Sequence, residues 1–367
     1  MKRSRITVLI GPRQCGKTTM ARKFVKPDSI NYFDLEDPIV LSVLQEPMTA
    51  LRKLKGIVVI DEIQLRPNLF PILRVLVDRN PLPAKFLILG SASPELLRQS
   101  AESLAGRIEI IFMSGFSLPE IGINCLDRHW LRGGFPLSFL AKSNEESLVW
   151  RKDFISTFLE RDLHKWGIGA AAPALRRFWS ILAHYHGQIW NAAEPARNLG
   201  INESTVRRYL DILSAVFMVR QLSPWHENLK KRQVKAPKIF FRDSGLLHNL
   251  LGVNSERELL LHPKCGASWE GYVLEETLKA LQPDEAYFWA THSGAELDLL
   301  LIKKGRRIGV ECKRIDAPKL TPSMRIALED LRLDHLWVIY PGERRYSLHE
   351  KVTAIPLPSL FVDRKII

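Results

Sequence analysis

The residues whose spacing is most specific for chemistry stand near the start of the chain. Residues 11–18 read GPRQCGKT and match G-x-x-x-x-G-K-[S/T], the Walker A pattern of a phosphate-binding loop. Glycines let such a loop curl until its N–H groups face a phosphate, Lys17 adds positive charge, and the Thr18 hydroxyl can reach Mg²⁺. A chance match in a glycine-containing turn is the alternative. The pattern predicts ATP and Mg²⁺ as cofactors, bound by Gly11, Pro12, Arg13, Gln14, Cys15, Gly16, Lys17, Thr18 and Thr19.

A pair of carboxylates follows an apolar run further along the chain. Residues 56–62 read GIVVIDE, which has the form of a Walker B strand. Asp61 is placed to complete the Mg²⁺ shell with Thr18, and Glu62 to orient or deprotonate the attacking water. A strand that ends in two carboxylates can also be only a solvated strand end, but the phosphate loop upstream favours the catalytic interpretation. Lys17 and Glu62 are therefore predicted to be catalytic.

Two more residues are candidates for contact with the γ-phosphate. Ser91 or Ser93, at the polar end of residues 86–93 (FLILGSAS), could sense that phosphate, although serine in a turn is as often only a cap. Arg107, which stands before the next apolar run, could be an arginine finger or a sensor, with a surface arginine as the alternative. An arginine finger that acts in trans requires a closed homo-oligomer.

Carboxylates and a lysine recur near the end of the chain. Residues 294–313 predict a hairpin in which Glu311 and Lys313 share one strand face. Asp298 and Glu311 could chelate a divalent metal that activates water, while Lys313 places the water or stabilises negative charge. Glu270, in the helix predicted just before, is a further candidate ligand. The alternative is a hairpin held by a cross-strand salt bridge.

A third group of candidates is basic. Residues 193–213 have the pattern of a helix, a short turn with glycine, and a second helix. If the second helix enters the major groove of DNA, Arg207 and Arg208 meet phosphate or guanine edges. A basic run follows in a predicted wing or loop and adds three DNA-contact candidates, Lys230, Lys231 and Arg232. Protein packing alone, and a solvated loop, are the alternatives.

These residues need a scaffold, and the apolar pattern of the first third predicts one. Short apolar runs alternate there with helical patterns, which is typical of a parallel sheet covered on both faces; the runs are residues 6–10, 30–35, 56–60, 86–89 and 108–113. A helix is predicted over residues 18–25, directly after the phosphate loop. Helical periodicity then predicts a lid or connector up to about residue 165, followed by helices with a strand pair and a mixed tail.

Composition excludes several classes of protein. The chain has 367 residues, 46% hydrophobic and 25% charged, which indicates two or three globular domains rather than a disordered, collagen-like or disulfide-stapled chain. Its 53 Lys and Arg against 40 Asp and Glu give a net charge of +13, which favours a polyanionic partner such as DNA, with a solvated basic surface as the alternative.

The remaining features concern localisation. No apolar run reaches the roughly 18 residues of a membrane span, and the start does not read as a signal peptide, so a cytoplasmic protein with no membrane partner is expected. The four cysteines form no C-x-x-C pair and are expected to be reduced thiols. His184, His186 and His292 lack metal-ligand spacing and are expected in the core or at the surface.

Several segments together resemble one family. GPRQCGKTT, VVIDEIQLRPNLFPILRVLVD, GSAS and ESLAGRIEI are similar to prokaryotic AAA-superfamily ATPases that carry a C-terminal domain of unknown function. GGFP (133–136), STFLERDL (156–163) and KIFFRDSGLL (238–247) resemble the same family, so the likeness covers nearly the whole chain. It implies an ATP-binding core, a winged-helix segment and a PD-(D/E)xK nuclease-like fold. Such proteins usually carry a segment before the first strand that packs near the base, so this chain is expected to start late or to be truncated.

The resulting prediction is an α/β protein in four parts. They are a P-loop NTPase core of AAA type with a parallel sheet (1–117), a helical lid or connector (118–170), a winged-helix domain (171–262) and a restriction-endonuclease-like, PD-(D/E)xK domain (263–367). The expected function is Mg²⁺-dependent ATP binding and hydrolysis, coupled to DNA engagement by the C-terminal half. An ATP-regulated, metal-dependent DNA nuclease and a slow nucleotide switch or scaffold without cleavage are the alternatives, and a small-molecule kinase is less favoured.

Overall fold

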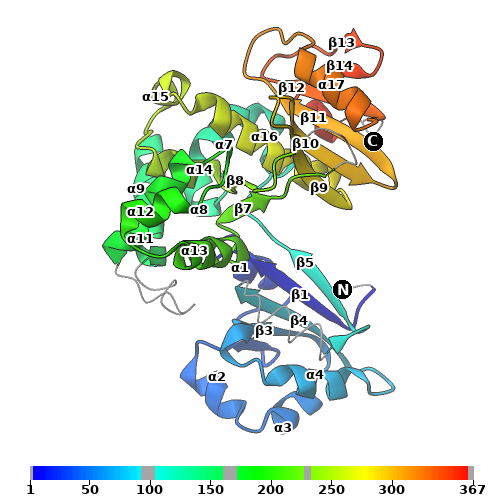
Figure 1. Ribbon diagram of the computed structural model, residues 1–367. Coiled ribbons are helices and arrows are strands. Elements are labelled where there is room, and N and C mark those ends of the chain that lie inside the picture. The colour runs from blue at the N-terminus through cyan, green and yellow to red at the C-terminus, as the bar shows by residue number, and fades with distance from the viewer. Residues whose placement is uncertain (1–2, 92–103, 160–171, 227–232, 363–367) are drawn as a thin grey trace. The chain divides into compact units, whose positions relative to one another are not determined.

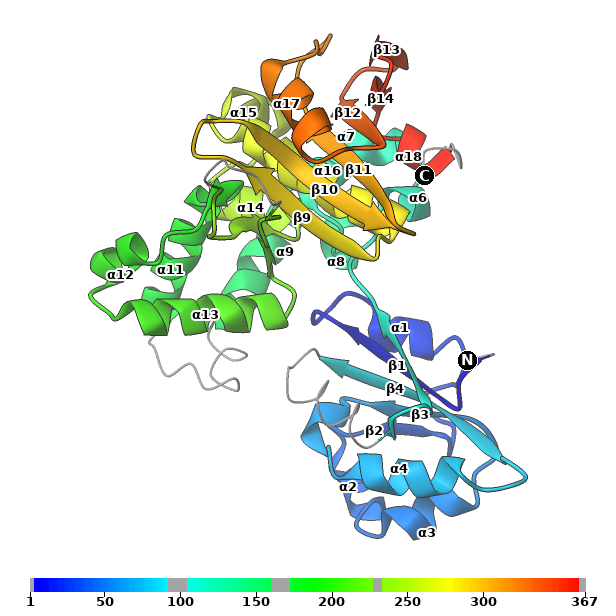
Figure 2. The ribbon, with the colours of Figure 1, turned by 45° about the vertical axis from the view of Figure 1, so that its right-hand side comes forward.

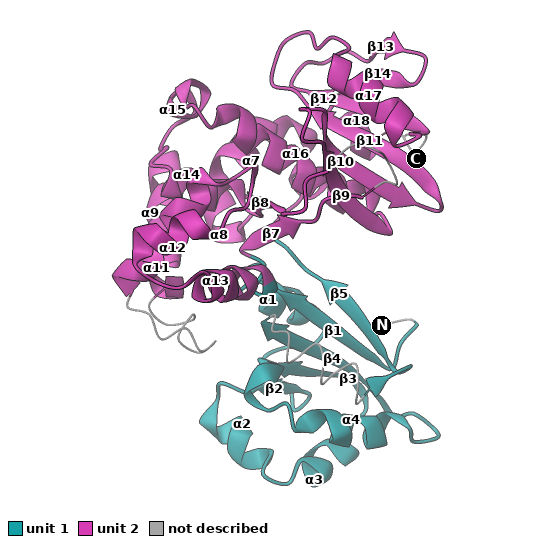
Figure 3. Cartoon of the chain, in the orientation of Figure 1, with its two compact units in different colours: residues 1–115, 215–217 teal, residues 116–214, 218–367 magenta. Residues whose placement is uncertain are grey.

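The structure is a computed structural model that describes residues 3–91, 104–159, 172–226 and 233–362 (Figure 1). Ser93 and the basic candidates Lys230, Lys231 and Arg232 lie outside the described residues. The chain forms two compact units (Figure 3). Unit 1 comprises residues 1–115 and 215–217, and unit 2 comprises residues 116–214 and 218–367.

Unit 1 is built on a five-stranded sheet in the order β2-β3-β4-β1-β5 (Figure 2). All neighbouring strands run parallel, which confirms the predicted parallel sheet. The strands fall close to the predicted apolar runs and are β1 (Ile6–Gly11), β2 (Tyr32–Asp34), β3 (Gly56–Asp61), β4 (Ala84–Ser91) and β5 (Ile108–Phe112).

Helices cover both faces of this sheet. Successive side chains of a strand point to opposite faces, so the strands contribute to two apolar cores. Ile60 and Ile88 pack with Phe70 in one apolar core, whereas Val59 and Leu89 pack on the other side in a second core. The helices are α1 (Lys17–Ala21), α2 (Pro38–Val43), α3 (Pro47–Arg52) and α4 (Leu69–Val77), with a 3₁₀ turn η1 (Ile63–Leu65). Helix α1 ends at Ala21, earlier than predicted, and the turns that follow still bring Val25 into the second core.

The first half of unit 2 is mainly helical. It begins with α6 (Leu118–Ile121), η2 (Ile123–Cys125), α7 (Leu126–Arg132), α8 (Pro136–Phe139) and α9 (Asn144–Thr157). It continues with α11 (Ala172–His184), β6 (Gln188–Ile189), α12 (Ala193–Leu199), α13 (Glu203–Ala215), β7 (Val219–Leu222) and β8 (Lys238–Phe241). The three strands form an antiparallel sheet in which β8 is central. Helices α12 and α13 confirm the predicted helix pair, and Gly200 ends α12 in the left-handed conformation that glycine adopts most easily.

The second half of unit 2 is a mixed six-stranded sheet with helices. Its elements are α14 (Ser244–Leu250), α15 (Glu256–Leu261), α16 (Cys265–Leu281), β9 (Glu285–Ala290), β10 (Glu296–Lys303), β11 (Arg306–Cys312), α17 (Pro322–Asp330), β12 (His335–Tyr340), β13 (Tyr346–His349), β14 (Val352–Pro356) and α18 (Ser359–Val362). The strand order is β13-β14-β12-β11-β10-β9. Strands β10 and β11 form the predicted hairpin, closed by Lys304 and Gly305, which both have positive φ as a tight two-residue hairpin turn requires.

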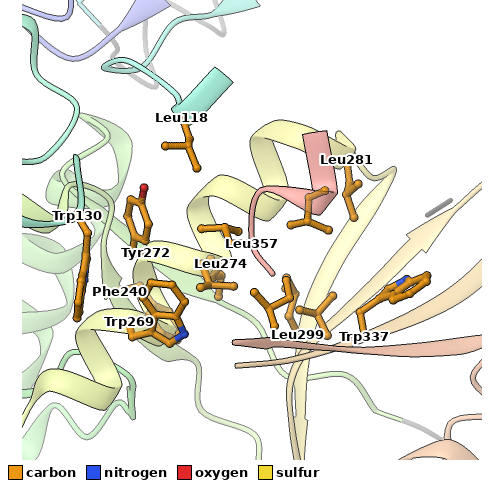
Figure 4. Close-up of a cluster of buried hydrophobic side chains, with 14 of the residues drawn as sticks. Leu118, Trp130, Phe240, Trp269, Tyr272, Leu274, Leu281, Leu299, Trp337 and Leu357 are labelled. Carbon is orange, nitrogen blue, oxygen red and sulfur yellow. The ribbon is translucent and has the colours of Figure 1, made fainter. Parts of the chain in front are cut away.

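One apolar core connects the parts of unit 2 (Figure 4). It contains Trp130 of α7, Phe240 of β8, Trp269 of α16, Leu299 of β10 and Trp337 of β12, all nearly inaccessible to water. The segments predicted as connector, winged helix and tail therefore bury their apolar surfaces together, and the boundaries drawn between them stay predictions. None of the described helices is long and apolar enough to cross a membrane.

The segments GGFP and KIFFRDSGLL contact each other in the structure. Asp243 caps α14 by accepting from Leu246 N at 2.9 Å and also accepts from Gly134 N at 2.8 Å. A side chain at Gly245 would lie 2.1 Å from the carbonyl oxygen of Arg132. The buried Arg151 guanidinium donates to the Gly245 carbonyl at 2.9 Å and ties α9 to the same point. Both glycine-containing motifs thus allow two backbones to approach closely.

We predict that Gly245→Ala lowers the free energy of unfolding of unit 2 by about 1–3 kcal/mol, the usual cost of overpacking a tight contact. Gly266→Ala is the matched control, because its added methyl group would meet no heavy atom within 4 Å. The control should be neutral or stabilise by up to about 1 kcal/mol, since alanine favours the helix. Urea unfolding followed by tryptophan fluorescence reports unit 2, which contains all nine tryptophans. Equal midpoints for the two variants would contradict the prediction.

Candidate nucleotide site and C-terminal acidic cluster

The phosphate loop lies at the carboxyl edge of the unit 1 sheet, between β1 and α1. Gly11 has no room for a side chain, because an added Cβ would lie 2.0 Å from the Met113 carbonyl oxygen. Gly16 has φ 102°, a conformation that other residues rarely adopt. Both glycines of the Walker A pattern are thus required by the backbone itself.

Lys17 begins α1, and its side chain turns back into the loop. Its ammonium is buried and donates to the carbonyl oxygens of Gly11 at 3.0 Å and of Pro12 at 2.7 Å. Both acceptors are neutral, so the positive charge stays available to attract an anion at the loop. The loop therefore has the form that phosphate binding needs.

Asp61, at the end of β3, joins three other groups. Its Oδ2 accepts from Thr18 Oγ1 and from the Tyr32 hydroxyl, each at 2.9 Å, and its Oδ1 accepts from Glu62 N at 3.0 Å. Burial and the neighbouring Asp61 charge raise the pKa of Tyr32 above its usual range. The structure thus brings together Thr18 and Asp61, the two predicted Mg²⁺ ligands. Their hydroxyl and carboxylate oxygens are ligands that suit this hard cation.

Glu62 is held by a residue that the sequence patterns did not single out. The side-chain nitrogen of Gln64 donates to Glu62 Oε2, and the side-chain oxygen of Gln64 accepts from Ser91 N at 3.1 Å. Burial raises the pKa of Glu62, although the hydrogen bond from Gln64 opposes the shift. The buried Ser91 Oγ has no hydrogen-bond partner among the described residues. Gln64 therefore connects the ends of β3 and β4, a role that no spacing in the sequence indicated.

Arg107 lies at the opposite edge of the sheet. Its carbonyl accepts from Ile6 N at 3.1 Å, at the start of β1, and its guanidinium pairs with Asp78 through Nε–Oδ1 at 2.7 Å. The six residues of β1 separate this edge from the phosphate loop by about 20 Å. The expectation of a γ-phosphate sensor in the same chain is therefore corrected, because parallel pairing of β1 and β5 places residue 107 beside residue 5 rather than residue 11. An arginine finger in trans stays a prediction.

Four carboxylates and two lysines of unit 2 form what we name the C-terminal acidic cluster: Glu270, Glu296, Asp298, Glu311, Lys238 and Lys313. Lys238 Nζ lies 3.3 Å from Glu270 Oε1 and 4.0 Å from Asp298 Oδ1, and it hydrogen-bonds Glu296. The predicted Glu270, Asp298, Glu311 and Lys313 are thus neighbours. Lys238 and Glu296 were missed as members of the site, because nothing in their spacing connects them to it.

The β11 side of the cluster has its own pairs. Lys313 Nζ donates to Glu311 Oε1 at 2.7 Å, as expected for side chains on one strand face, and Cys312 N donates to Asp298 Oδ2 at 2.8 Å. Burial raises the pKa of Glu270 and that of Glu311 to about 8. No group of three or more His, Cys, Asp or Glu side chains in the described part of the chain is arranged to hold a metal ion. The predicted metal role of Glu270, Asp298 and Glu311 stays a prediction.

The predicted DNA-contact residues that the structure describes lie on α13. Arg207 and Arg208 are exposed, whereas Val206 and Leu210 are buried. Arg207 pairs with Glu203 one turn away, at 3.3 Å between Nη2 and Oε2. This pair is exposed to solvent and can open at little cost.

The histidines that were expected in the core or at the surface are found there. His186 is buried, where it accepts from Phe241 N at 3.0 Å, and burial lowers its pKa to about 3. His184 and His292 are exposed.

We predict that Gln64→Ala loosens the ends of β3 and β4, because Glu62 and the Ser91 N–H lose a partner in a buried setting, at a cost of about 1–3 kcal/mol. Amide hydrogen exchange should become faster in peptides that cover residues 59–65 and 86–91. Gln45→Ala is the control, since Gln45 is exposed, and its exchange pattern should match the wild type. Unchanged exchange in Gln64→Ala would show that the bridge contributes nothing.

Comparison with known families divides the chain into three matches. An AAA domain matches residues 3–122, and two domains of unknown function match residues 123–257 (DUF8612) and 265–360 (DUF4143). The AAA match confirms the predicted AAA-type core in the N-terminal part, and the third match confirms a C-terminal domain of unknown function.

Two curated relatives match over the whole chain. They are Uncharacterized protein Mb2031c of Mycobacterium bovis and Uncharacterized protein Rv2008c of Mycobacterium tuberculosis. Each is 50% identical over 366 residues, which cover 100% of this chain and 83% of the relative.

Similarity to solved structures is lower. The Bacillus subtilis DNA clamp loader delta protein has a TM-score of 0.28 and 14% identity, covering 56% of this chain and 82% of that one. Protein VC1899 from Vibrio cholerae has a TM-score of 0.19 and 12% identity, covering 97% of this chain and 95% of that one. Scores of this size carry no argument about fold or function.

Proposed function

The chain belongs to the family of these two mycobacterial proteins and carries an AAA domain, and from that premise we propose that it binds ATP with Mg²⁺ and hydrolyses the nucleotide. The observation that carries the proposal is the convergence of Lys17, Thr18, Asp61 and Glu62 at one edge of the parallel sheet. Each has the side chain that phosphoryl transfer to water requires at that place.

The residues of the loop would bind the phosphates. Lys17 can exchange the carbonyls of Gly11 and Pro12 for phosphate oxygens, which bear full negative charge and so attract its ammonium more strongly. The N–H groups of the loop and of the start of α1 would add further donors to the phosphates. Thr18 and Asp61 would hold Mg²⁺, which when bound neutralises charge on the phosphates.

Glu62 would act on the attacking water. Its carboxylate lies beside the predicted Mg²⁺ ligand Asp61, and its burial favours uptake of a proton. Gln64 holds Glu62 in place, and Tyr32 fixes Asp61, so these two are positioning residues. Ser91 N is bonded to Gln64, which connects the end of β4 to Glu62.

DNA engagement by the C-terminal half is the second part of the proposal. The order α11–β6–α12–α13–β7–β8, with a three-stranded antiparallel sheet, supports a winged helix with α13 as recognition helix. Exposed arginines on α13 and the net charge of +13 supply the attraction to phosphate. Coupling between nucleotide state and this engagement completes the proposed function.

We predict that Lys17→Ala abolishes ATP binding and turnover, and that Glu62→Gln still binds ATP but turns it over about 10²–10⁴-fold more slowly, the usual contribution of a general base. Phosphate release and nucleotide binding are measured on the same samples. Lys23→Ala, an exposed lysine after α1, is the control and should keep wild-type turnover. Undiminished hydrolysis by Lys17→Ala would refute the ATPase, whereas wild-type binding with negligible turnover would identify the slow nucleotide switch.

We predict that Arg207→Gln and Arg208→Gln weaken binding to double-stranded DNA and that each lowers the slope of log affinity against log salt by about 1. Fluorescence anisotropy at several salt concentrations, with and without ATP, measures both quantities. Arg257→Gln, an exposed arginine on α15, should change neither. Equal losses in all three variants would mean that charge alone, and not α13, attracts DNA.

A further inference from the structure

We propose that the Lys238 ammonium is the resident cation of the C-terminal acidic cluster, in the place where a D…E-x-K site would hold a divalent metal. The cluster in this fold therefore does not fit Mg²⁺ or Mn²⁺, and the chain does not cleave DNA through it. Lys238 of β8 lies beside three carboxylates, which are Glu270 of α16 and Glu296 and Asp298 of β10. These elements are distant from β8 in the sequence.

The backbone of Lys238 is fixed on both sides. Strand β8 is the central strand of its sheet, where Lys238 pairs with Ile189 of β6 and with Leu222 of β7. Its side chain is only 4% exposed, and its ammonium lies 5.5 Å from the centre of the Phe288 ring. A lysine held in this way differs from a mobile surface lysine, because its backbone is paired on both sides and its side chain is enclosed.

The ammonium replaces a metal by position and by charge. It hydrogen-bonds Glu270 and Glu296 and lies 4.0 Å from Asp298 Oδ1, so a single cation faces three carboxylates. A divalent ion shared by Glu270 and Asp298 would need their oxygens at about 2.0–2.6 Å, and the Lys238 ammonium already lies 3.3 Å from the first and 4.0 Å from the second. Repulsion between the ammonium and a divalent ion would oppose the entry of that ion further. This agrees with the lack of any metal-holding arrangement among the described residues.

Glu311 shows independently that the cluster contains a carboxylate oxygen without a partner. It is 4% exposed, its Oε1 accepts from Lys313, and its buried Oε2 has no partner in the described part of the chain. Asp298 lies beside it and accepts from Cys312 N. The cluster thus contains a buried acceptor, Glu311 Oε2, that neither lysine pairs with. Without Lys238 only Lys313 would face the four carboxylates, and a divalent cation could take over the lost positive charge.

The test replaces Lys238 by methionine, which removes the charge and keeps most of the stem. Thermal unfolding of the full, nucleotide-free chain is followed by tryptophan fluorescence with and without Mn²⁺, and Mn²⁺ stoichiometry is measured by electron paramagnetic resonance. Lys238→Met should unfold at a lower temperature than the wild type. Adding Mn²⁺ should restore at least half of this decrease in unfolding temperature, and the variant should bind one Mn²⁺ more than the wild type. Lys238→Met/Asp298→Asn should show neither the gain nor the extra ion.

Lys235→Met is the matched control, because Lys235 is exposed just before β8, and Mn²⁺ should affect it no more than the wild type. A folded Lys238→Met that binds no additional Mn²⁺ would overturn the proposal. If Lys238→Met does not fold, Mn²⁺ binding is compared between the wild type and Asp298→Asn. Weaker binding by Asp298→Asn would overturn the proposal, because it would show that the cluster holds Mn²⁺ with Lys238 in place. Equal binding by the two proteins would uphold it. The test contains no ATP, so its outcome is independent of the proposed ATPase.

Discussion

Burial of α16 is the constraint on which unit 2 depends. A helix enclosed on most sides needs a partner for each charged group that it buries, because an unpaired buried charge is costly. Glu275 is paired with Arg220 and Arg242, and although burial alone would raise its pKa, these arginines bring it down to about 2. Glu276 accepts from Leu118 N at 2.8 Å, and Ser268 accepts from Trp130 at 3.0 Å. The partners come from α6, α7, β7 and the end of β8, so the helix determines how these segments assemble.

Lys238 and Glu270 belong to the same set of interactions. Glu270 lies on α16 and needs a cation, and β8 is placed by the core around Phe240 and Trp269 so that Lys238 meets it. The lysine therefore completes the packing of α16 and also enters the cluster that β10 and β11 form. A single side chain thus satisfies the structural demand of the helix and, in the role proposed for it, supplies the positive charge that a metal would otherwise bring to the acidic residues.

The two polar sites of the chain differ in what holds their charges. In unit 1 the oxygens of Thr18 and Asp61 bond to each other, and Lys17 bonds to neutral carbonyls, so both a cation and an anion can still enter. In the C-terminal acidic cluster the ammonium of Lys238 already faces the carboxylates. The first arrangement is open to exchange of ligands, whereas in the second the chain itself supplies a cation. This contrast places the proposed chemistry in unit 1.

The sequence by itself determined the features that depend on neighbours along the chain. The phosphate loop, the apolar strands, the helix pair at α12 and α13 and the β10–β11 hairpin follow from local spacing and alternation. Only the tertiary structure decided which edge of the sheet Arg107 occupies, that Gln64 joins Glu62 to Ser91, and that Lys238 lies among Glu270, Glu296 and Asp298. These relations join separate elements through parallel pairing and helix packing, and spacing along the chain contains no record of such distances.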